Sequence, residues 1–178
     1  MMNISKRLIL MTLLATLIPA CASKQLAKIE TVPQVDLPKF MGDWYVIAAI
    51  PTSIETESYN AIENYRLKDD GTIATTFTFN KGSLNGPKKT YEPHGFVVKD
   101  SGNAKWGMQF IWPIKAEYLI AYLDENYTQT VIARNARDYV WIMARSPSIS
   151  ESDYKKLTSL VQNLGYNTSK LREVPHNK

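Results

Sequence analysis

The side chains that most often carry out chemistry are scarce in this 178-residue sequence, which has one cysteine and two histidines. His94 and His176 are too few for a histidine metal site, and Cys21 alone cannot form an internal disulfide or a cluster of thiolate ligands. The sequence contains no Gly-x-Ser-x-Gly elbow and no phosphate-binding loop. We therefore expect no catalytic residue, no metal and no cofactor, and we predict that the protein is not an enzyme.

Cys21 directly follows a segment that differs from the rest of the chain. Lys6 and Arg7 precede thirteen uncharged residues, Leu8 to Ala20. This stretch is shorter than the about 20 apolar residues of a transmembrane helix, and a basic start with a short apolar core is typical of a secretory signal peptide. The run Ile18-Pro19-Ala20-Cys21 resembles a bacterial lipobox, with an aliphatic residue three positions before the cysteine.

The lipobox resemblance implies that Cys21 becomes the first residue of the mature protein, with diacylglycerol on its sulfur and a further acyl chain on its amino group. Two acyl chains already give stable anchoring, so three would hold the protein on a bilayer. Because Ala22 rather than aspartate follows, we expect the outer membrane, with the protein facing the periplasm. The alternative is an ordinary secretion signal in which Cys21 stands by chance. We assign residues 1–20 to a signal peptide, 21–34 to a lipidated tether and 35–178 to one folded domain.

The composition is that of an ordinary folded domain, with 44% hydrophobic and 11% aromatic residues. The formal charge of +4 includes Lys6 and Arg7, so the chain after residue 20 carries 19 basic and 17 acidic residues, or +2. No run of basic residues indicates a nucleic-acid surface.

Short apolar segments with turn residues between them predict an all-β domain. Alternation within residues 73–79 and 106–112 is typical of strands that are buried on one face. Eight strands with short connections indicate an antiparallel sandwich or an up-and-down barrel. The expected strands are Trp44–Ile50, Ala61–Leu67, Thr72–Asn80, Thr90–Lys99, Ala104–Trp112, Tyr118–Leu123, Thr130–Arg134 and Tyr139–Arg145.

One helix is expected after these strands. Ser150 with Asp153 three residues later fits a capping box, and Gly165 is a suitable C-terminal cap. Apolar residues repeat at helical spacing from Tyr154 to Leu164, on one stripe that must pack against the outside of the sheet. Residues 170–174 are expected to add a short strand.

Three short motifs lie at defined positions in this order of elements. Gly42 and Trp44 form a Gly-x-Trp at the start of the first strand, Asp138 and Tyr139 lie between the seventh and eighth strands, and Arg145 ends the eighth. These residues resemble the three signatures of the lipocalin family, over residues 35 to 174. With the lipobox, the chain is most similar to the bacterial outer-membrane lipocalin lipoproteins. The resemblance implies an eight-stranded antiparallel up-and-down β-barrel with one C-terminal α-helix packed outside, in which Arg145 stacks on Trp44 at the closed end.

Function is then expected in the barrel interior, which can hold one small ligand if side chains do not fill it. We take Trp44 and Arg145 as inward and assign the lining by alternation and by the resemblance, which also place Ala61 inside. The same residues could simply be packed core, above all near the closed end. The predicted ligand-binding residues are Glu63, Tyr65, Phe77, Phe79, Trp106, Met108, Phe110, Tyr118, Ile120, Tyr122, Trp141 and Met143.

Glu63 departs from the apolar lining that the resemblance implies, and a buried carboxylate without a partner is costly. It could pair with an internal arginine or tyrosine, lie near the open rim, reflect a change of register or contact a ligand headgroup.

Large aromatic residues with flexible methionines suit an acyl chain, and the resemblance implies fatty acids or lysophospholipids as ligands. We therefore expect a membrane-anchored lipid-binding protein that stores or transports such lipids for envelope maintenance. The alternative is an envelope interaction protein that binds a protein partner at the barrel rim. The sequence leaves the oligomeric state open, including a homodimer.

Overall fold

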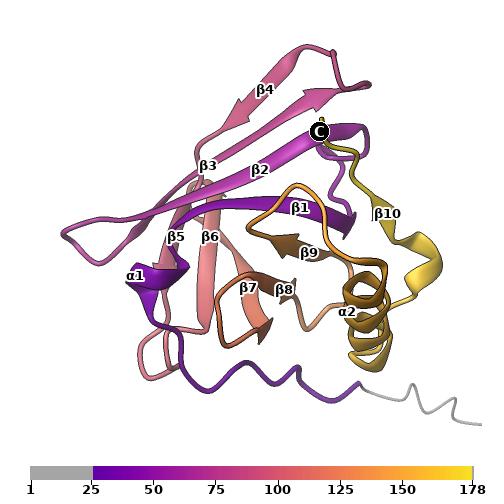
Figure 1. The fold of residues 1–178 in the computed structure, drawn as a ribbon. Helices are drawn as coiled ribbons and strands as arrows, with labels where there is room; N and C mark the ends of the chain where they lie inside the picture. The colour runs from indigo at the N-terminus through magenta and orange to yellow at the C-terminus, as the bar shows by residue number, and fades with distance from the viewer. Residues whose placement is uncertain (1–25, 178) are drawn as a thin grey trace, which may run out of the picture.

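Short antiparallel strands make up most of the structure, a computed structural model that describes residues 26–177 (Figure 1). The strands are β1 (Gly42–Ile50), β2 (Ser58–Leu67), β3 (Ile73–Lys81), β4 (Lys88–Tyr91), β5 (His94–Val97), β6 (Lys105–Ile111), β7 (Ile114–Leu123), β8 (Gln129–Ala133), β9 (Val140–Ala144) and β10 (Arg172–Glu173). The helices are α1 (Leu37–Phe40), α2 (Glu151–Asn163) and the 3-10 turn η1 (Thr168–Lys170).

These strands form one sheet that closes on itself. Neighbours follow the chain from β1 to β9, and β9 pairs with β1. The strand expected at 90–99 is divided into β4 and β5 at Pro93, which has no N–H to donate to a ladder. Both parts pair with β3, β4 with residues 77–80 and β5 with residues 73 and 74. Counted as one, they make eight strands around the barrel, so the predicted fold is confirmed.

The C-terminal segment fills a gap between β1 and β2. These strands pair only up to Tyr45 and then diverge, and β10 lies beside Ala48 and Ala49. Beyond β10, the Val174 N–H donates to the Ile47 carbonyl at 2.9 Å, and the Pro175 carbonyl accepts from the backbone of β2 at 2.8 Å. The predicted short strand thus joins the barrel wall.

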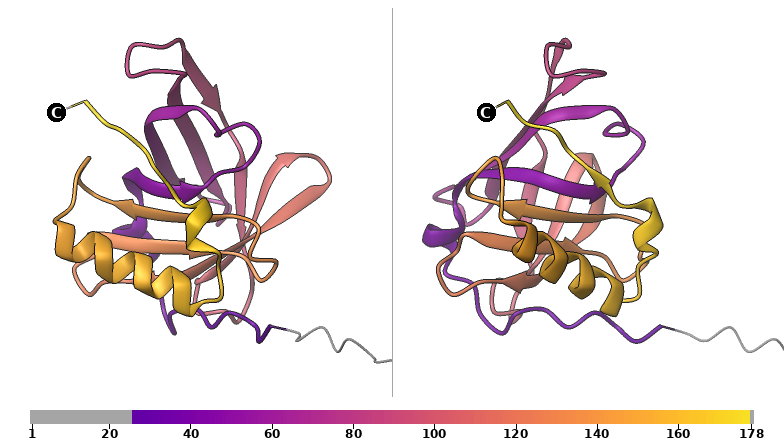
Figure 2. Two further views of the ribbon diagram at one scale, coloured as in Figure 1. Left: turned by 90° about the vertical axis from the view of Figure 1, so that its right-hand side faces the viewer. Right: turned by 45° about the vertical axis from the view of Figure 1, so that its right-hand side comes forward.

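Helix α2 covers one outer face of the barrel, as expected (Figure 2). Its cap is the predicted one, because the Ser150 side chain accepts from the Asp153 N–H at 3.1 Å. Leu157 and Val161 are completely buried against the outward side chains of the strands. Gly165, just after the helix, has a φ of +92°, which favours glycine. Among the described residues, neither helix has the length and hydropathy needed to cross a membrane.

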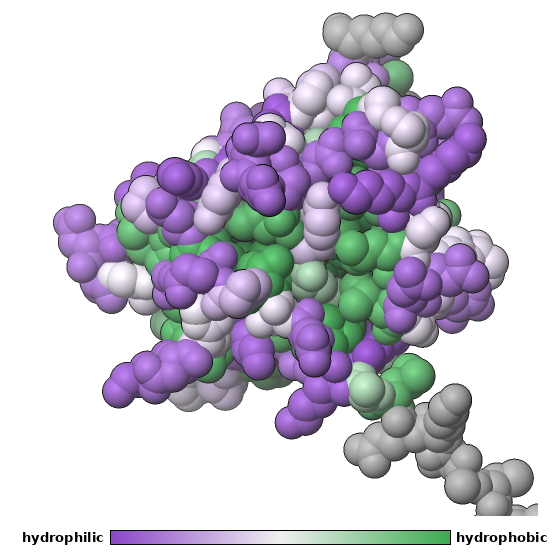
Figure 3. All heavy atoms as spheres, turned by 60° about the horizontal axis from the view of Figure 1, so that its bottom comes forward, coloured by the Kyte–Doolittle hydropathy of each residue, from purple (hydrophilic) through white to green (hydrophobic). Residues whose placement is uncertain are grey.

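The described part of the expected tether, residues 26–34, packs on the barrel. Residues 26–35 run along the lower edge in Figure 1, and Figure 3 turns this side forward, where apolar surface shows between polar side chains. Ile29 is buried and donates its N–H to Asn135 Oδ1 at 2.8 Å, and Val32 donates to the Ile120 carbonyl at 3.0 Å. The packed region therefore starts before the expected boundary at Val35. The sequence did not indicate this, because the two contacts do not depend on a periodic pattern.

One end of the barrel is closed by α1, Trp44 and Arg145. The Trp44 indole donates to the Phe40 carbonyl at 2.9 Å, and the Arg145 guanidinium lies 3.9 Å from the centre of the Trp44 ring, so the predicted stacking is confirmed. Arg145 also joins this helix to neighbouring loops. It donates to the carbonyls of Asp43 (2.7 Å), Lys39 (2.9 Å), Phe40 (3.0 Å) and Tyr127 (3.3 Å).

Replacement of Arg145 by alanine should lower stability, because it removes the hydrogen bonds to these four carbonyls and the contact with the Trp44 ring. We expect a loss of roughly 2–4 kcal/mol in the free energy of unfolding, measured by denaturant titration. Arg145→Lys is the matched control and should recover only part of the loss, since an ammonium lacks the planar fork. An unchanged unfolding midpoint in Arg145→Ala would contradict this account of the closed end.

Candidate functional site

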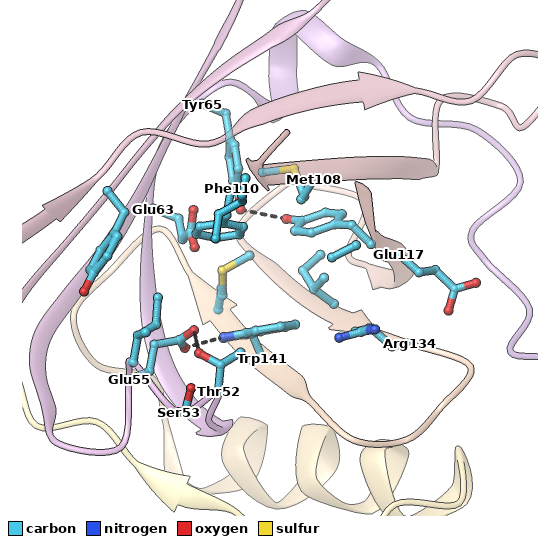
Figure 4. A pocket seen from close by; sticks show the side chains of 17 residues that line it. Thr52, Ser53, Glu55, Glu63, Tyr65, Met108, Phe110, Glu117, Arg134 and Trp141 are labelled. Atoms are coloured by element: carbon cyan, nitrogen blue, oxygen red, sulfur yellow. Dashed lines mark hydrogen bonds between the residues drawn. The ribbon is translucent and has the colours of Figure 1, made fainter. Parts of the chain in front are cut away.

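The opposite end of the barrel holds a cavity of about 350 Å³ (Figure 4). Its walls come from the inward faces of β2, β4, β6, β7, β8 and β9, and from the loop between β1 and β2. The antiparallel strands bring the ends of β6 and β8 and the starts of β7 and β9 to this mouth. Trp44 closes the end of the barrel that lies opposite this mouth.

Seven of the predicted ligand residues line this cavity. Tyr65, Tyr118 and Met143 are buried within it, whereas Phe110 lies at the mouth with 48% of its surface exposed. The expected alternation from Trp106 to Trp112 fails here, because the pairing of β6 with β7 shifts between residues 108 and 111. The seven are Glu63, Tyr65, Met108, Phe110, Tyr118, Trp141 and Met143.

Four other predicted residues lie inside the barrel but are packed in its core rather than along the cavity. Phe79 stacks on Tyr91 with ring centres 6.1 Å apart, and Trp106 stacks on Tyr118 at 5.1 Å. These aromatic contacts fill the space below and beside the cavity. The four are Phe77, Phe79, Trp106 and Ile120.

Tyr122 was expected inside the barrel, and the structure corrects this placement. The pairing of β7 with β8 shifts between Ile120 and Tyr122, so Tyr122 pairs with Val131 and shares its outer face. The Tyr122 hydroxyl accepts a hydrogen bond from Lys156 of α2 at 3.1 Å. A β-bulge of this kind reverses the alternation beyond it.

Several lining residues were missed by the sequence reasoning. Tyr91 pairs with Phe77 and Ile132 pairs with Trp141, so correct strand registers would have found both. Glu55 belongs to the loop between β1 and β2, which folds over the cavity, and no local pattern indicates this. The other missed residues are Thr52, Ser53, Ile54, Ile111, Ala116, Glu117 and Arg134.

Two carboxyl groups face this mostly apolar space. Glu55 is 5% exposed and accepts hydrogen bonds from Thr52 Oγ1 at 2.6 Å and from the Trp141 indole at 2.8 Å. Burial raises its pKa, and these bonds oppose the rise. Burial, and then the nearby charge of Glu55, raises the pKa of Glu63 to about 8. Glu63 Oε2 is fully buried and has no hydrogen-bond partner among the described residues.

The tyrosines beside Glu63 form a second polar group. The hydroxyls of Tyr65 and Tyr118 lie 2.7 Å apart and hydrogen-bond to one another. Burial and the charge of Glu63 raise the pKa of both phenols well above the ordinary value. Both phenols therefore stay neutral at any physiological pH.

The other charged side chains of the lining are engaged at the mouth. Arg134 Nη1 lies 3.3 Å from Asp138 Oδ2, and its guanidinium is 5.3 Å from the centre of the Tyr139 ring. Glu117 accepts hydrogen bonds from Asn135 at 2.6 and 2.7 Å. The motif residues Asp138 and Tyr139 thus hold Arg134 at the rim.

The remaining predictions concern metals and Cys21. Within residues 26–177, no group of three or more His, Cys, Asp and Glu side chains could hold a metal ion. Cys21, the signal peptide and the start of the tether lie outside the described residues.

Comparison with known proteins identifies the architecture. The family model of a lipocalin-like domain matches residues 35–176. The chain belongs to the lipocalin family. It is 29% identical to temperature-induced lipocalin-1 of Arabidopsis thaliana, over 83% of each chain. It is 28% identical to outer membrane lipoprotein Blc of Citrobacter freundii, over 88% of this chain and 89% of the relative.

Solved structures agree with this assignment at the level of the fold. Insecticyanin from the tobacco hornworm Manduca sexta superposes with a TM-score of 0.67 at 16% identity, over 85% of this chain and 86% of that one. The expected similarity to bacterial outer-membrane lipocalin lipoproteins is confirmed by the match to Blc. Like other lipocalins, the protein has a barrel that closes at one end and is suited to a small hydrophobic ligand.

The first lipocalin signature also has a direct structural reason. Gly42 has a φ of +92°, and a Cβ there would come within 3.5 Å of Arg145 Nη1. A side chain at this position would therefore strain the backbone, although its Cβ would make only an ordinary van der Waals contact with the guanidinium that stacks on Trp44.

The raised pKa of Glu63 makes the stability of this lipocalin depend on pH. A carboxyl whose pKa rises on folding, from an ordinary 4.5 to about 8, stabilises the fold below pH 4.5 and loses this contribution as the pH rises towards 8. Denaturant titrations at pH 5 and pH 8 should therefore show a fall in the free energy of unfolding, of roughly 2–4 kcal/mol from Glu63. Glu63→Gln should reduce the fall, and the part due to Glu55 should remain. An equal fall in both proteins would contradict the buried position of Glu63.

Proposed function

We propose that this lipocalin is a membrane-anchored carrier that binds single-chain lipids, fatty acids or lysophospholipids, in its barrel and serves envelope maintenance without catalysis. The observation that carries the proposal is the open cavity lined by aromatic, aliphatic and methionine side chains. Its 350 Å³ lies near the lower end of the range of about 300–1,000 Å³ for small-molecule pockets. This volume suits one acyl chain better than two.

The path of the N-terminal segment supports an anchor on the open side of the barrel. The Ala27 carbonyl accepts from Arg137, and Ile29 bonds to Asn135, both in the turn after β8 at the cavity mouth. Leu26 is five positions after Cys21 in the sequence, a reach of at most roughly 18 Å. A lipidated Cys21 would therefore keep the mouth near the bilayer surface.

The β6–β7 hairpin gives a second argument for a mouth that faces lipid. Its tip exposes Ile111 (72%), Trp112 (82%) and Ile114 (68%), next to Phe110 at the cavity entrance. Exposed apolar patches on soluble proteins commonly mark sites that contact a membrane, a ligand or another protein. Apolar surface thus continues from the hairpin tip into the cavity, and an acyl chain leaving a bilayer could follow it without crossing water.

Lipid binding itself is tested with the purified lipocalin. Native lipid extraction with mass spectrometry should recover a single-chain lipid, and titration with a fluorescent fatty acid at pH 6.5 should saturate at micromolar concentration. The alternative function is that of a protein that binds a partner at its rim. Such a protein would show no saturable binding of any acyl ligand, and that result would contradict the proposed carrier function.

The anchor is tested by Cys21→Ser. We expect this variant to appear soluble in the periplasm or unprocessed, because the acylated sulfur is lost. Membrane and soluble fractions are compared by immunoblot with those of the unaltered protein. Continued fractionation with membranes would show that the assignment of the anchor is wrong.

The hairpin is tested by the double variant Trp112→Ser and Ile114→Ser. Because neither side chain lines the cavity, the dissociation constant for a dissolved fluorescent lysolipid should be unchanged. The rate at which the protein extracts that lysolipid from phosphatidylethanolamine and phosphatidylglycerol vesicles should fall several-fold. Leu67→Ser with Val98→Ser is the matched control, since these residues expose apolar surface at the closed end. Equal extraction rates in both double variants would remove the hairpin from lipid uptake.

A further inference from the structure

Among the described residues, the charged side chains that line the cavity are three glutamates and one arginine. Glu63 comes from β2 and Glu55 from the loop after β1, and Figure 4 shows both carboxyl groups on the same side of the cavity. They are close enough that the charge of Glu55 raises the pKa of Glu63. Glu55 has two hydrogen-bond donors, whereas Glu63 Oε2 is buried without one among residues 26–177. The Glu63 side chain lines the cavity, while its unpartnered oxygen is itself buried.

No positive charge in the described part of the chain compensates these acids inside the cavity. Arg134 is the only basic side chain among the lining residues that the structure describes. Its Nη1 pairs with Asp138 and its guanidinium lies over the Tyr139 ring, while its Nε is buried without a hydrogen-bond partner among residues 26–177. The third lining carboxylate, Glu117, is bonded to Asn135. The cavity therefore presents Glu55 and Glu63 to its contents without a cation from residues 26–177 between them.

Aromatic rings surround the two carboxyl groups. The Trp141 indole donates to Glu55, and Tyr65 lies beside Glu63. Tyr91 and Tyr118 line the same cavity. The faces of such rings attract cations, most strongly where water is excluded, and aromatic surroundings are a common means of binding quaternary ammonium groups.

We propose that the cavity selects amphiphiles with a cationic nitrogen, which the carboxyl groups of Glu55 and Glu63 and the surrounding aromatic rings hold while the acyl chain fills the apolar space. This inference rests on the proposed function and narrows it to a class of headgroup. An anionic headgroup has the opposite preference, because it must share a low-dielectric space with these acids.

The proposal predicts opposite pH dependences for cationic and anionic ligands. The titratable groups around Glu63 are Glu55 from the β1–β2 loop, Tyr65 from β2, Tyr91 from β4, Glu117 and Tyr118 from β7 and Arg134 after β8. Because the pKa of Glu63 in the empty cavity is about 8, a cation that binds the ionised form must displace a proton at pH 6 but hardly at pH 9. Its affinity therefore rises with pH, and that of a carboxylate falls.

The experiment is calorimetric titration of the purified protein with three ligands of one chain length, dodecyltrimethylammonium, dodecanol and dodecanoate, below their micellar concentrations. The quaternary ammonium keeps its charge at every pH. Between pH 6 and 9 its affinity should rise about tenfold for each unit by which it lowers the pKa of Glu63. Dodecanoate should weaken over the same range, and dodecanol should change little. At pH 8.5 the cation should bind about tenfold more tightly than dodecanoate.

The variants are Glu63→Gln and, as a matched control, Glu57→Gln. Glu63→Gln keeps the shape of the side chain and should remove most of the pH dependence and the preference for the cation. Glu57→Gln changes an exposed carboxylate of the same β1–β2 loop as Glu55, outside the cavity lining, and should leave both unchanged. Unfolding midpoints of all three proteins are measured at the same pH values, so that a loss of fold is not mistaken for a loss of binding.

The outcomes separate this inference from the proposed function. Binding of all three ligands with equal affinity, or the same pH dependence in Glu63→Gln, would overturn the headgroup preference and leave the lipid carrier intact. No binding of any ligand at any pH would overturn the carrier itself. A preference for the cation that rises with pH and depends on Glu63 would support both.

Discussion

The closure of one end of the barrel by Arg145 is the interaction on which the other features depend. A single guanidinium stacks on Trp44 and donates to carbonyls of α1, of β1 and of the loop before β8. These segments are far apart in sequence, and no other side chain type offers a planar cation with enough donors to join them. Because this end is sealed and filled with aromatic side chains, a ligand can enter the barrel only from the opposite end.

The two ends of the barrel also differ in how they use polar groups. At the closed end, the polar atoms of Trp44 and Arg145 are hydrogen-bonded. In the cavity, Glu63 keeps an oxygen that no described protein group satisfies, and its raised pKa is the physical cost of that position. A glutamine of the same shape at this position would avoid much of this cost. The carboxyl group therefore lowers the free energy of unfolding, and a bound ligand can offset this loss. Sites that bind ligands commonly contain such a local conflict with stability.

The sequence predicted the global fold better than the lining of the cavity, for a definite physical reason. The alternation of β3, the Ser150 cap and the stacking of Arg145 on Trp44 each depend on short sequence patterns, and all are present as predicted. Tyr122 was misplaced because of a β-bulge, which adds one residue to a strand without changing its hydrophobic pattern. Glu55 reaches the cavity through a loop whose path is set by tertiary contacts with Trp141. Strand register would have placed Tyr91 and Ile132, since each pairs with a residue that was correctly taken as inward.

Four segments that are separate in sequence meet at the open end, and their roles depend on each other. The β1–β2 loop places Glu55, the β6–β7 hairpin exposes apolar side chains, the turn after β8 holds Arg134, and the segment before α1 binds that same turn through Ala27 and Ile29. A cation headgroup that bound between Glu55 and Glu63 would leave its chain in the apolar part of the same space. Release into a bilayer would then have two requirements. The acyl chain would leave along the apolar hairpin, and the headgroup would leave when the carboxyl groups are protonated or when another cation replaces it. The chain and the headgroup would therefore control separate steps. A lipid with a neutral headgroup would meet only the first of these barriers. In the proposed carrier, the acid pair would therefore retain one class of lipid longer than another without any change in the shape of the barrel.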